Sequence, residues 1–120
     1  MTWDDLFAVN ADVNKLPYLA DPSYLDDWSP IDESGGDCDS YAVGKFRRLV
    51  EQGHALESLR LATCYTETNE YHAVLIASAD EADWMLDNRF PKPILISDIP
   101  NLGYKKDKMQ GEGLTWVEWK

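Results

Sequence analysis

The sequence has few cysteines and no long apolar segment. Two cysteines among 120 residues do not make a disulfide framework, and free thiols in a reducing compartment are the simpler expectation. No segment reaches the roughly 18 consecutive apolar residues that a membrane-spanning helix needs. The acidic start from Met1 to Asp5 lacks the basic and apolar regions of a secretory signal, which predicts a cytoplasmic protein.

Positive charge is also scarce. The chain has 11 Lys and Arg against 22 Asp and Glu, a net charge of −11, and residues 1–40 hold ten of the acids and a single lysine. Such a surface repels phosphate backbones, so we expect no nucleic-acid partner. The same acidity is compatible with a solubilising face or with binding of a hard cation such as Ca²⁺.

The remaining composition predicts one folded domain over residues 1–120. Apolar residues make up 44% of the chain and aromatic residues 12%, which is enough for a core at this length. Apolar spacing predicts a helix from about residue 3 to 15, with Thr2 as its cap and Asp5 in capping-box position. A second helix is predicted over 38–52 and ends at Gly53. Its expected apolar stripe consists of Ala42, Val43, Phe46, Leu49 and Val50.

The second half of the chain reads as antiparallel sheet. Alternating or β-branched runs predict strands near 59–66, 71–78, 84–88, 94–99 and 115–119, separated by polar turns. Residues 17–36 read as an irregular segment, and the charged run 105–108 as a solvated loop. Helices followed by strands are typical of the α+β class.

Three residues suggest a catalytic triad. Cys38 opens the second helix directly after Gly35 and Gly36, His72 lies on one predicted strand, and Asp87 lies on the next. A helix N-terminus favours the reactive thiolate, and its free N–H groups can receive an oxyanion. A histidine can take the thiol proton, and an acid fixes the tautomer of that histidine. Each residue alone is a weak signal, but their order on a helix and two strands is more specific.

The sequence around these residues resembles the bacterial transglutaminase-like cysteine peptidases of the LapG type. The resemblance covers nearly the whole chain, and the nucleophile and acid motifs are its most specific parts. The segments that carry it are Val9-Asn10, Val13-Asn14, Tyr18 with Asp21, Trp28-Ser29-Pro30, Gly36-Asp37-Cys38-Asp39-Ser40-Tyr41-Ala42-Val43 with Lys45, Leu59-Arg60-Leu61, His72-Ala73-Val74-Leu75 and Leu86-Asp87-Asn88.

The resemblance implies a papain-like α+β fold in which the nucleophile helix packs on an antiparallel sheet. It implies a thiol peptidase that cleaves a protein or peptide substrate through an acyl-enzyme, with Cys38, His72 and Asp87 as the triad. It also implies a Ca²⁺ site near the nucleophile, carried here by Asp37 and Asp39. The alternative is that these two acids only cap the helix and occupy its first turn.

The sequence departs from the family pattern at two positions. Ala73 follows the histidine where the family usually has Met, and Ser40 stands where an acid is usual. The typical periplasmic export signal is also absent. These departures leave the triad intact, and the substrate, the regulatory partner and a bacterial or phage source are not specified by the sequence.

Other functions remain open at this level. The same triad would serve a transglutaminase, another acyltransferase or a cell-wall amidase, because the acyl-enzyme is shared. A non-catalytic binding module that uses the acidic face is a further alternative. The backbone N–H of Cys38 is the expected first oxyanion donor, and Asn10, Asn14 and Trp28 are candidates for the second. Cys64, within an apolar run, is expected to be an ordinary buried strand residue.

Overall fold

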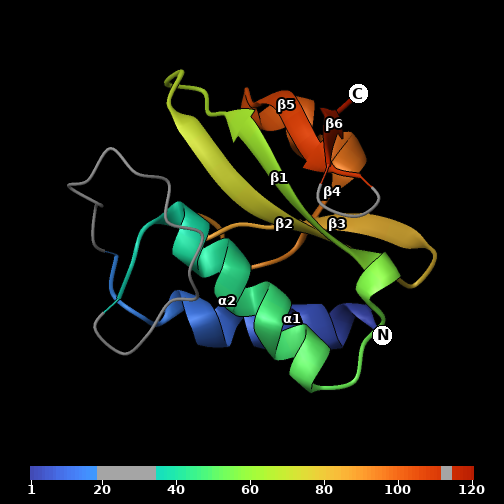
Figure 1. The fold of residues 1–120 in the computed structure, drawn as a ribbon. Helices are drawn as coiled ribbons and strands as arrows, with labels where there is room; N and C mark the ends of the chain where they lie inside the picture. The colour runs from blue at the N-terminus through green and yellow to red at the C-terminus, as the bar shows by residue number, and fades with distance from the viewer. Residues whose placement is uncertain (19–34, 112–114) are drawn as a thin grey trace.

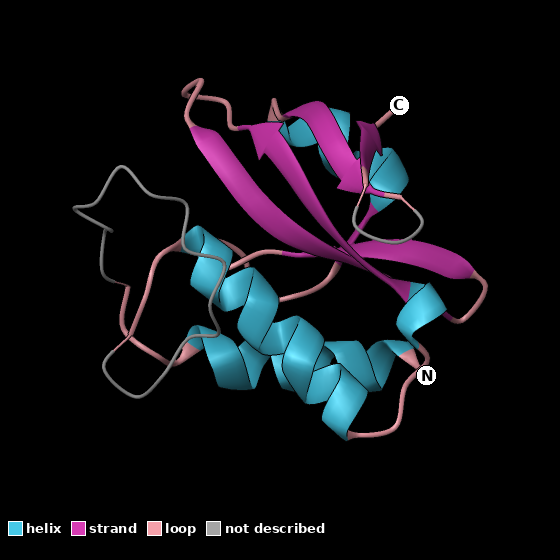
Figure 2. Cartoon of the chain, viewed as in Figure 1, coloured by secondary structure: helices cyan, strands magenta, loops and turns pink. Residues whose placement is uncertain are grey.

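The structure is a computed structural model that describes residues 1–18, 35–111 and 115–120. Two helices precede a sheet, as the α+β class requires (Figure 2). The helices are α1 (Trp3–Asn14) and α2 (Cys38–Glu51), and the short 3₁₀ helix η1 (Leu56–Ser58) leads into the sheet. Within the described residues, no helix is long and apolar enough to cross a membrane.

Strands β1 to β6 form one antiparallel sheet in the order β4-β3-β2-β1-β5-β6. The central strands β1 (Leu59–Tyr65), β2 (Tyr71–Ala79) and β3 (Ala82–Leu86) follow one another through short turns. Strand β4 (Ile94–Leu95) leads to the 3₁₀ helix η2 (Ile96–Leu102), and β5 (Lys105–Gln110) and β6 (Trp116–Glu118) complete the other edge.

Both faces of the sheet are covered. Figure 1 shows α1 and α2 against one face, where Leu75 and Ala77 of β2 join buried residues of both helices in one cluster. Val74 and Ile76 point to the opposite face and pack in a second cluster that includes Ile99 of η2. Burial on both faces explains why β2 is a nearly continuous apolar run.

The predicted helix boundaries are confirmed to within a residue or two. Thr2 and Asp5 form the expected capping box at the start of α1, and Gly53 after α2 has the left-handed φ of 92° that favours glycine. The predicted stripe of α2 is largely confirmed, because Ala42 and Leu49 are buried and Phe46 and Val50 pack against the core. The buried residues of α2 are Tyr41, Ala42, Gly44, Lys45 and Leu49, so a lysine occupies a core position.

Two of the expectations for the sheet are wrong. The charged run 105–108 is part of strand β5, which pairs with the edge of β1 from Ala62↔Met109 to Tyr65↔Lys105. Pairing with a distant strand overrides the polar character of a segment, and local sequence does not reveal it. Only Ile94 and Leu95 of the predicted strand 94–99 pair with β3, and the chain then turns into η2.

Candidate active site

Cys38 is the first residue of α2, and the chain before it approaches the helix through a tight passage. Gly35 has a φ of 100°, and a Cβ there would lie 2.1 Å from the carbonyl oxygen of Pro17. Only glycine fits this position. Asp37 is the N-cap, and its carboxylate accepts a hydrogen bond from the backbone N–H of Ser40 at 3.3 Å. The glycine and the cap together hold the thiol at the N-terminus of the helix.

The thiol of Cys38 is partly buried between α2 and β2. The pKa of this thiol is raised to about 12, chiefly by burial and also by Asp39 and Asp37, while the backbone of Ala73 acts in the opposite direction. The Sγ atom donates to Oδ1 of Asp39 at 3.4 Å.

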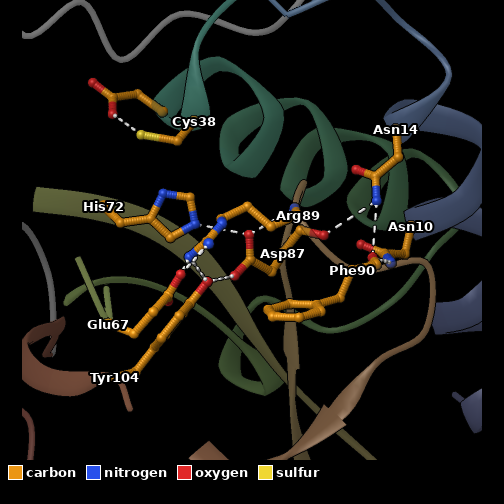
Figure 3. Close-up of polar contacts among 10 residues, drawn as sticks. Asn10, Asn14, Cys38, Glu67, His72, Asp87, Arg89, Phe90 and Tyr104 are labelled. Carbon is orange, nitrogen blue, oxygen red and sulfur yellow. Dashed lines mark hydrogen bonds and ion pairs between the residues drawn. The ribbon is translucent and has the colours of Figure 1, made fainter. Parts of the chain in front are cut away.

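His72 and Asp87 form a buried pair. Nε2 of His72 lies 2.7 Å from Oδ1 of Asp87, and the two side chains are 7% and 0% exposed. The His72 ring lies between Cys38 and Asp87, with Nδ1 on the side turned towards Cys38 (Figure 3). An acid on Nε2 leaves Nδ1 as the nitrogen that can accept a proton from the thiol.

Asp87 lies one residue beyond the end of β3, rather than on the strand as the sequence predicts. The pKa of the Asp87 carboxyl is lowered from the ordinary 3.8. Burial by itself raises this pKa, but the hydrogen bond and charge of His72 and the donors from Arg89 and Tyr104 outweigh the effect of burial. The Tyr104 hydroxyl donates to Oδ2 at 2.7 Å, and the Arg89 backbone N–H donates to Oδ1 at 2.9 Å. Asp87 is therefore held as a carboxylate in a fixed orientation.

An ion pair extends this network to the surface. The guanidinium of Arg89 binds the carboxylate of Glu67 and donates to the Tyr104 hydroxyl at 2.9 Å. Sequence reasoning missed both Arg89 and Tyr104. Arg89 is two residues after Asp87 and could have been included with the acid motif. Tyr104 is 17 residues further along the chain, and no local signal connects it to the acid.

Two asparagines of α1 hold the loop that follows Asp87. The Asn14 side-chain amide donates to the backbone carbonyls of Asp87 and Phe90, both at 3.1 Å. The Asn10 amide donates to the carbonyls of Phe90 and Pro91 at 3.0 and 3.2 Å. These amides were candidates for the second oxyanion donor, but here they support the acid loop of residues 87–91 (Figure 3). The third candidate, Trp28, lies outside the described residues.

A cleft of about 250 Å³ lies beside His72 and the start of α2. It runs from the start of α2 across β1 and β2 towards β5 and β6, and its lining combines aromatic, hydroxyl and charged groups. The lining residues are Asp39, Thr63, Tyr71, His72, Ala73, Lys108 and Trp116. A peptide in this cleft would reach His72 and the end of α2 that carries Cys38.

Cys64 lies elsewhere, as the sequence predicts. It is 0% exposed in the cluster on the far face of the sheet. Burial, followed by the charge of Asp87, raises the pKa of its thiol to about 12. The two cysteines are free thiols, and Cys38 directly precedes Asp39, which lines the cleft.

The two acids beside Cys38 have the ligand chemistry that a cation site would need. Asp37 and Asp39 flank the thiol and offer carboxylate oxygens, the donors that Ca²⁺ prefers. Among the described residues no group of three or more His, Cys, Asp or Glu side chains is arranged to hold a metal ion. The donor chemistry fits calcium, but two carboxylates are fewer than its usual six to eight oxygen ligands.

Comparison with known proteins agrees with this geometry. A model of the bacterial transglutaminase-like cysteine proteinases matches residues 1–120. Calcium-bound LapG of Legionella pneumophila is 27% identical with a TM-score of 0.77, over 91% of this chain and 65% of that one. EGTA-treated LapG of the same organism is 26% identical with a TM-score of 0.80, over 98% of this chain and 67% of that one. The chain thus spans about two thirds of the LapG chains, and no curated protein matches it.

Proposed function

This chain belongs to the bacterial transglutaminase-like cysteine proteinases, and we propose that residues 1–120 form one peptidase domain that cleaves a peptide bond through an acyl-enzyme on Cys38. The proposed triad is Cys38, His72 and Asp87. The observation that carries it is the buried 2.7 Å contact between His72 and Asp87, with Cys38 at the start of α2 on the side of the ring that carries Nδ1 (Figure 3).

The reaction begins with transfer of the thiol proton. Cys38 gives its proton to Nδ1 of His72, and the thiolate attacks the carbonyl carbon of the substrate. Asp87 stabilises the resulting imidazolium through Nε2. The oxyanion receives a hydrogen bond from the free backbone N–H of Cys38 at the start of α2.

The second half of the reaction releases both products. His72 protonates the leaving amine, the C–N bond breaks, and the acyl group stays on sulfur. His72 then takes a proton from water, which attacks the thioester, and the thiolate leaves with the acid product released. Because the surroundings of Cys38 raise its pKa, formation of the thiolate depends on proton transfer to His72.

We also propose that Asp37 and Asp39 contribute to a Ca²⁺ site. Support comes from the oxygen chemistry of the two side chains and from the calcium-bound state of a LapG structure. A bound cation would neutralise the two carboxylates next to the thiol. Asp37 would keep its second role as the cap of α2, because one carboxylate can accept several interactions.

The test compares wild type with Cys38→Ala in a substrate screen based on newly formed protein N-termini. We expect new termini with wild type alone, and isopeptide products would indicate transfer to an amine instead of water. In the same preparations, tryptic mapping after short iodoacetamide treatment should show Cys38 labelled well ahead of Cys64. Slow and equal labelling of both thiols, with no new termini, would contradict the proposal.

A further inference from the structure

Lys45 occupies a position where a lysine is not expected. It lies on the buried face of α2 and is 0% exposed, and its Nζ has no hydrogen-bond partner among the residues that the structure describes. An ammonium group away from water is costly unless it is compensated. Lys45 follows Cys38 by seven residues, which is two helical turns and therefore the same face of the helix.

The contacts between the helices locate Lys45 relative to α1. At one end, the Tyr41 hydroxyl donates to the carbonyl oxygen of Leu16, and at the other end Arg48 pairs with Asp12. Lys45 lies midway between Tyr41 and Arg48, so it faces the last turn of α1. Its Nζ is 5.9 Å from the centre of the Tyr41 ring, a contact that compensates the charge only in part.

The last turn of α1 and the acid loop provide buried acceptors without partners. The side-chain oxygens of Asn10, Asn14 and Asn88 have no hydrogen-bond partner within the described parts of the chain. The amide nitrogens of Asn10 and Asn14 are already used to hold the acid loop. An ammonium group has three donors and no acceptor, and it complements amide oxygens directly or through a water molecule.

Lys45 interacts electrostatically with Asp87, the acid of the proposed triad. Burial lowers the pKa of Lys45 to about 7, and the Asp87 carboxylate acts in the opposite direction and raises it. The interaction is mutual, since a cation that Asp87 stabilises also stabilises the ionised form of Asp87. Lys45 is thus electrostatically coupled to Asp87, and Asn14 binds the backbone carbonyl of Asp87.

We propose that Lys45 is a positioning residue for Asp87: its buried ammonium on the nucleophile helix supports the Asp87 carboxylate by charge and complements, through water, the free amide oxygens of α1 and the acid loop. The inference rests on the proposed triad. It explains why the helix that carries the nucleophile has a lysine in its core. In this arrangement, a buried charge on the helix that carries Cys38 favours the position of Asp87 relative to that helix.

The test uses Lys45→Met, which keeps the length of the side chain and removes the charge, with Arg47→Met as an exposed control on the same helix. Two readouts are compared at pH 7 and constant calcium: the iodoacetamide rate of Cys38, and the NMR signal of the proton shared by His72 and Asp87. We expect at least a fivefold slower rate and loss or an upfield shift of this signal in Lys45→Met, with wild-type behaviour in Arg47→Met.

The outcomes separate this inference from the proposed function. If Cys38 of wild type is not labelled ahead of Cys64, the triad itself fails. If wild type is reactive and a folded Lys45→Met variant retains both its rate and its NMR signal, the positioning role is wrong. If Lys45→Met does not fold, Lys45→Gln replaces it, because glutamine keeps donors without a charge. Wild-type values for both readouts in folded Lys45→Gln would equally overturn the proposal.

Discussion

The environment of Asp87 illustrates how single residues set the chemistry of the site. Its carboxylate accepts from His72, from the Tyr104 hydroxyl and from the backbone of Arg89. Each of these donors favours the ionised form, and together they outweigh the effect of burial. A carboxylate with this many donors can orient His72 without exchanging protons itself.

Tyr104→Phe should show the contribution of one donor. The variant loses the hydrogen bond to Asp87, so we expect it to be less stable than wild type by about 2 kcal/mol at pH 7, a typical value for a hydrogen bond to a charged group. The pKa of Asp87 should rise, and the acid limb of the pH–activity profile should move to higher pH. Urea denaturation and pH profiles measure the two effects.

The sign of the pH effect on stability follows from the lowered pKa of Asp87. Stability from its ionised form is fully present above the unfolded pKa, near the ordinary 3.8, and is lost as the pH falls through the lower folded value. The difference between wild type and Tyr104→Phe should therefore shrink at about pH 3. A constant difference between pH 7 and pH 3 would contradict this assignment, and Tyr65→Phe on β1 is the exposed control.

At the scale of secondary-structure elements, the start of α2 combines three functions in as many residues. Asp37 caps the helix, Cys38 presents the thiol, and Asp39 accepts its hydrogen bond. A helix N-terminus favours anions, but here the two carboxylates raise the thiol pKa. The element alone therefore does not activate the cysteine, and the proposed function assigns this role to His72 on β2.

The proposed calcium site lies at the start of α2, and its effect on stability can be measured. EGTA should lower the melting temperature of wild type by about 5 °C or more, as expected for removal of a ligand present in large excess over its dissociation constant. Asp37→Asn combined with Asp39→Asn should remove the response. Asparagine is as good an N-cap as aspartate, so the comparison reports on metal binding and not on capping.

A matched control comes from the other helix. Asp4 is a first-turn acid of α1, and Asp4→Asn should keep the full response to EGTA in differential scanning fluorimetry. No response in wild type would remove calcium from the mechanism. A response that persists in the double variant would place the ion at other residues.

At the scale of the whole molecule, the proposed triad depends on the packing of the helices against the sheet. Cys38 belongs to α2, whereas His72 and Asp87 belong to the sheet and its connecting loop. Leu6 of α1 is 0% exposed in the cluster that joins the helices to β2. The same helix holds the acid loop through Asn10 and Asn14.

Leu6→Ala should therefore weaken both the fold and the site. Removal of a fully buried leucine side chain leaves a cavity and costs about 3 kcal/mol. The exposed Leu56 is the control, at 59% exposure, and Leu56→Ala should change stability by less than about 0.5 kcal/mol. Chemical denaturation measures both values. Equal effects of the two substitutions would mean that α1 is not packed on the sheet as described.

Local sequence was sufficient to predict the elements that depend on interactions between neighbouring residues. The capping box at Thr2, the helix that begins at Cys38 and the alternating strands β1 and β2 depend on neighbouring residues, and their predicted limits agree closely with the structure. The local motifs and their order along the chain were also sufficient to select Cys38, His72 and Asp87 as candidates. Their assignment to a triad remains a prediction for the experiments above.

Only the tertiary structure decided features that join distant parts of the chain. Residues 105–110 form strand β5 because they pair with the edge of β1. Tyr104 can bind Asp87 because η2 leads the chain back to the face of the sheet opposite the helices. Lys45 is buried where α2 packs against α1 and the sheet, although a lysine in a helix ordinarily predicts an exposed position. Propensity and spacing act over a few residues, whereas these contacts span the fold and depend on how its layers pack.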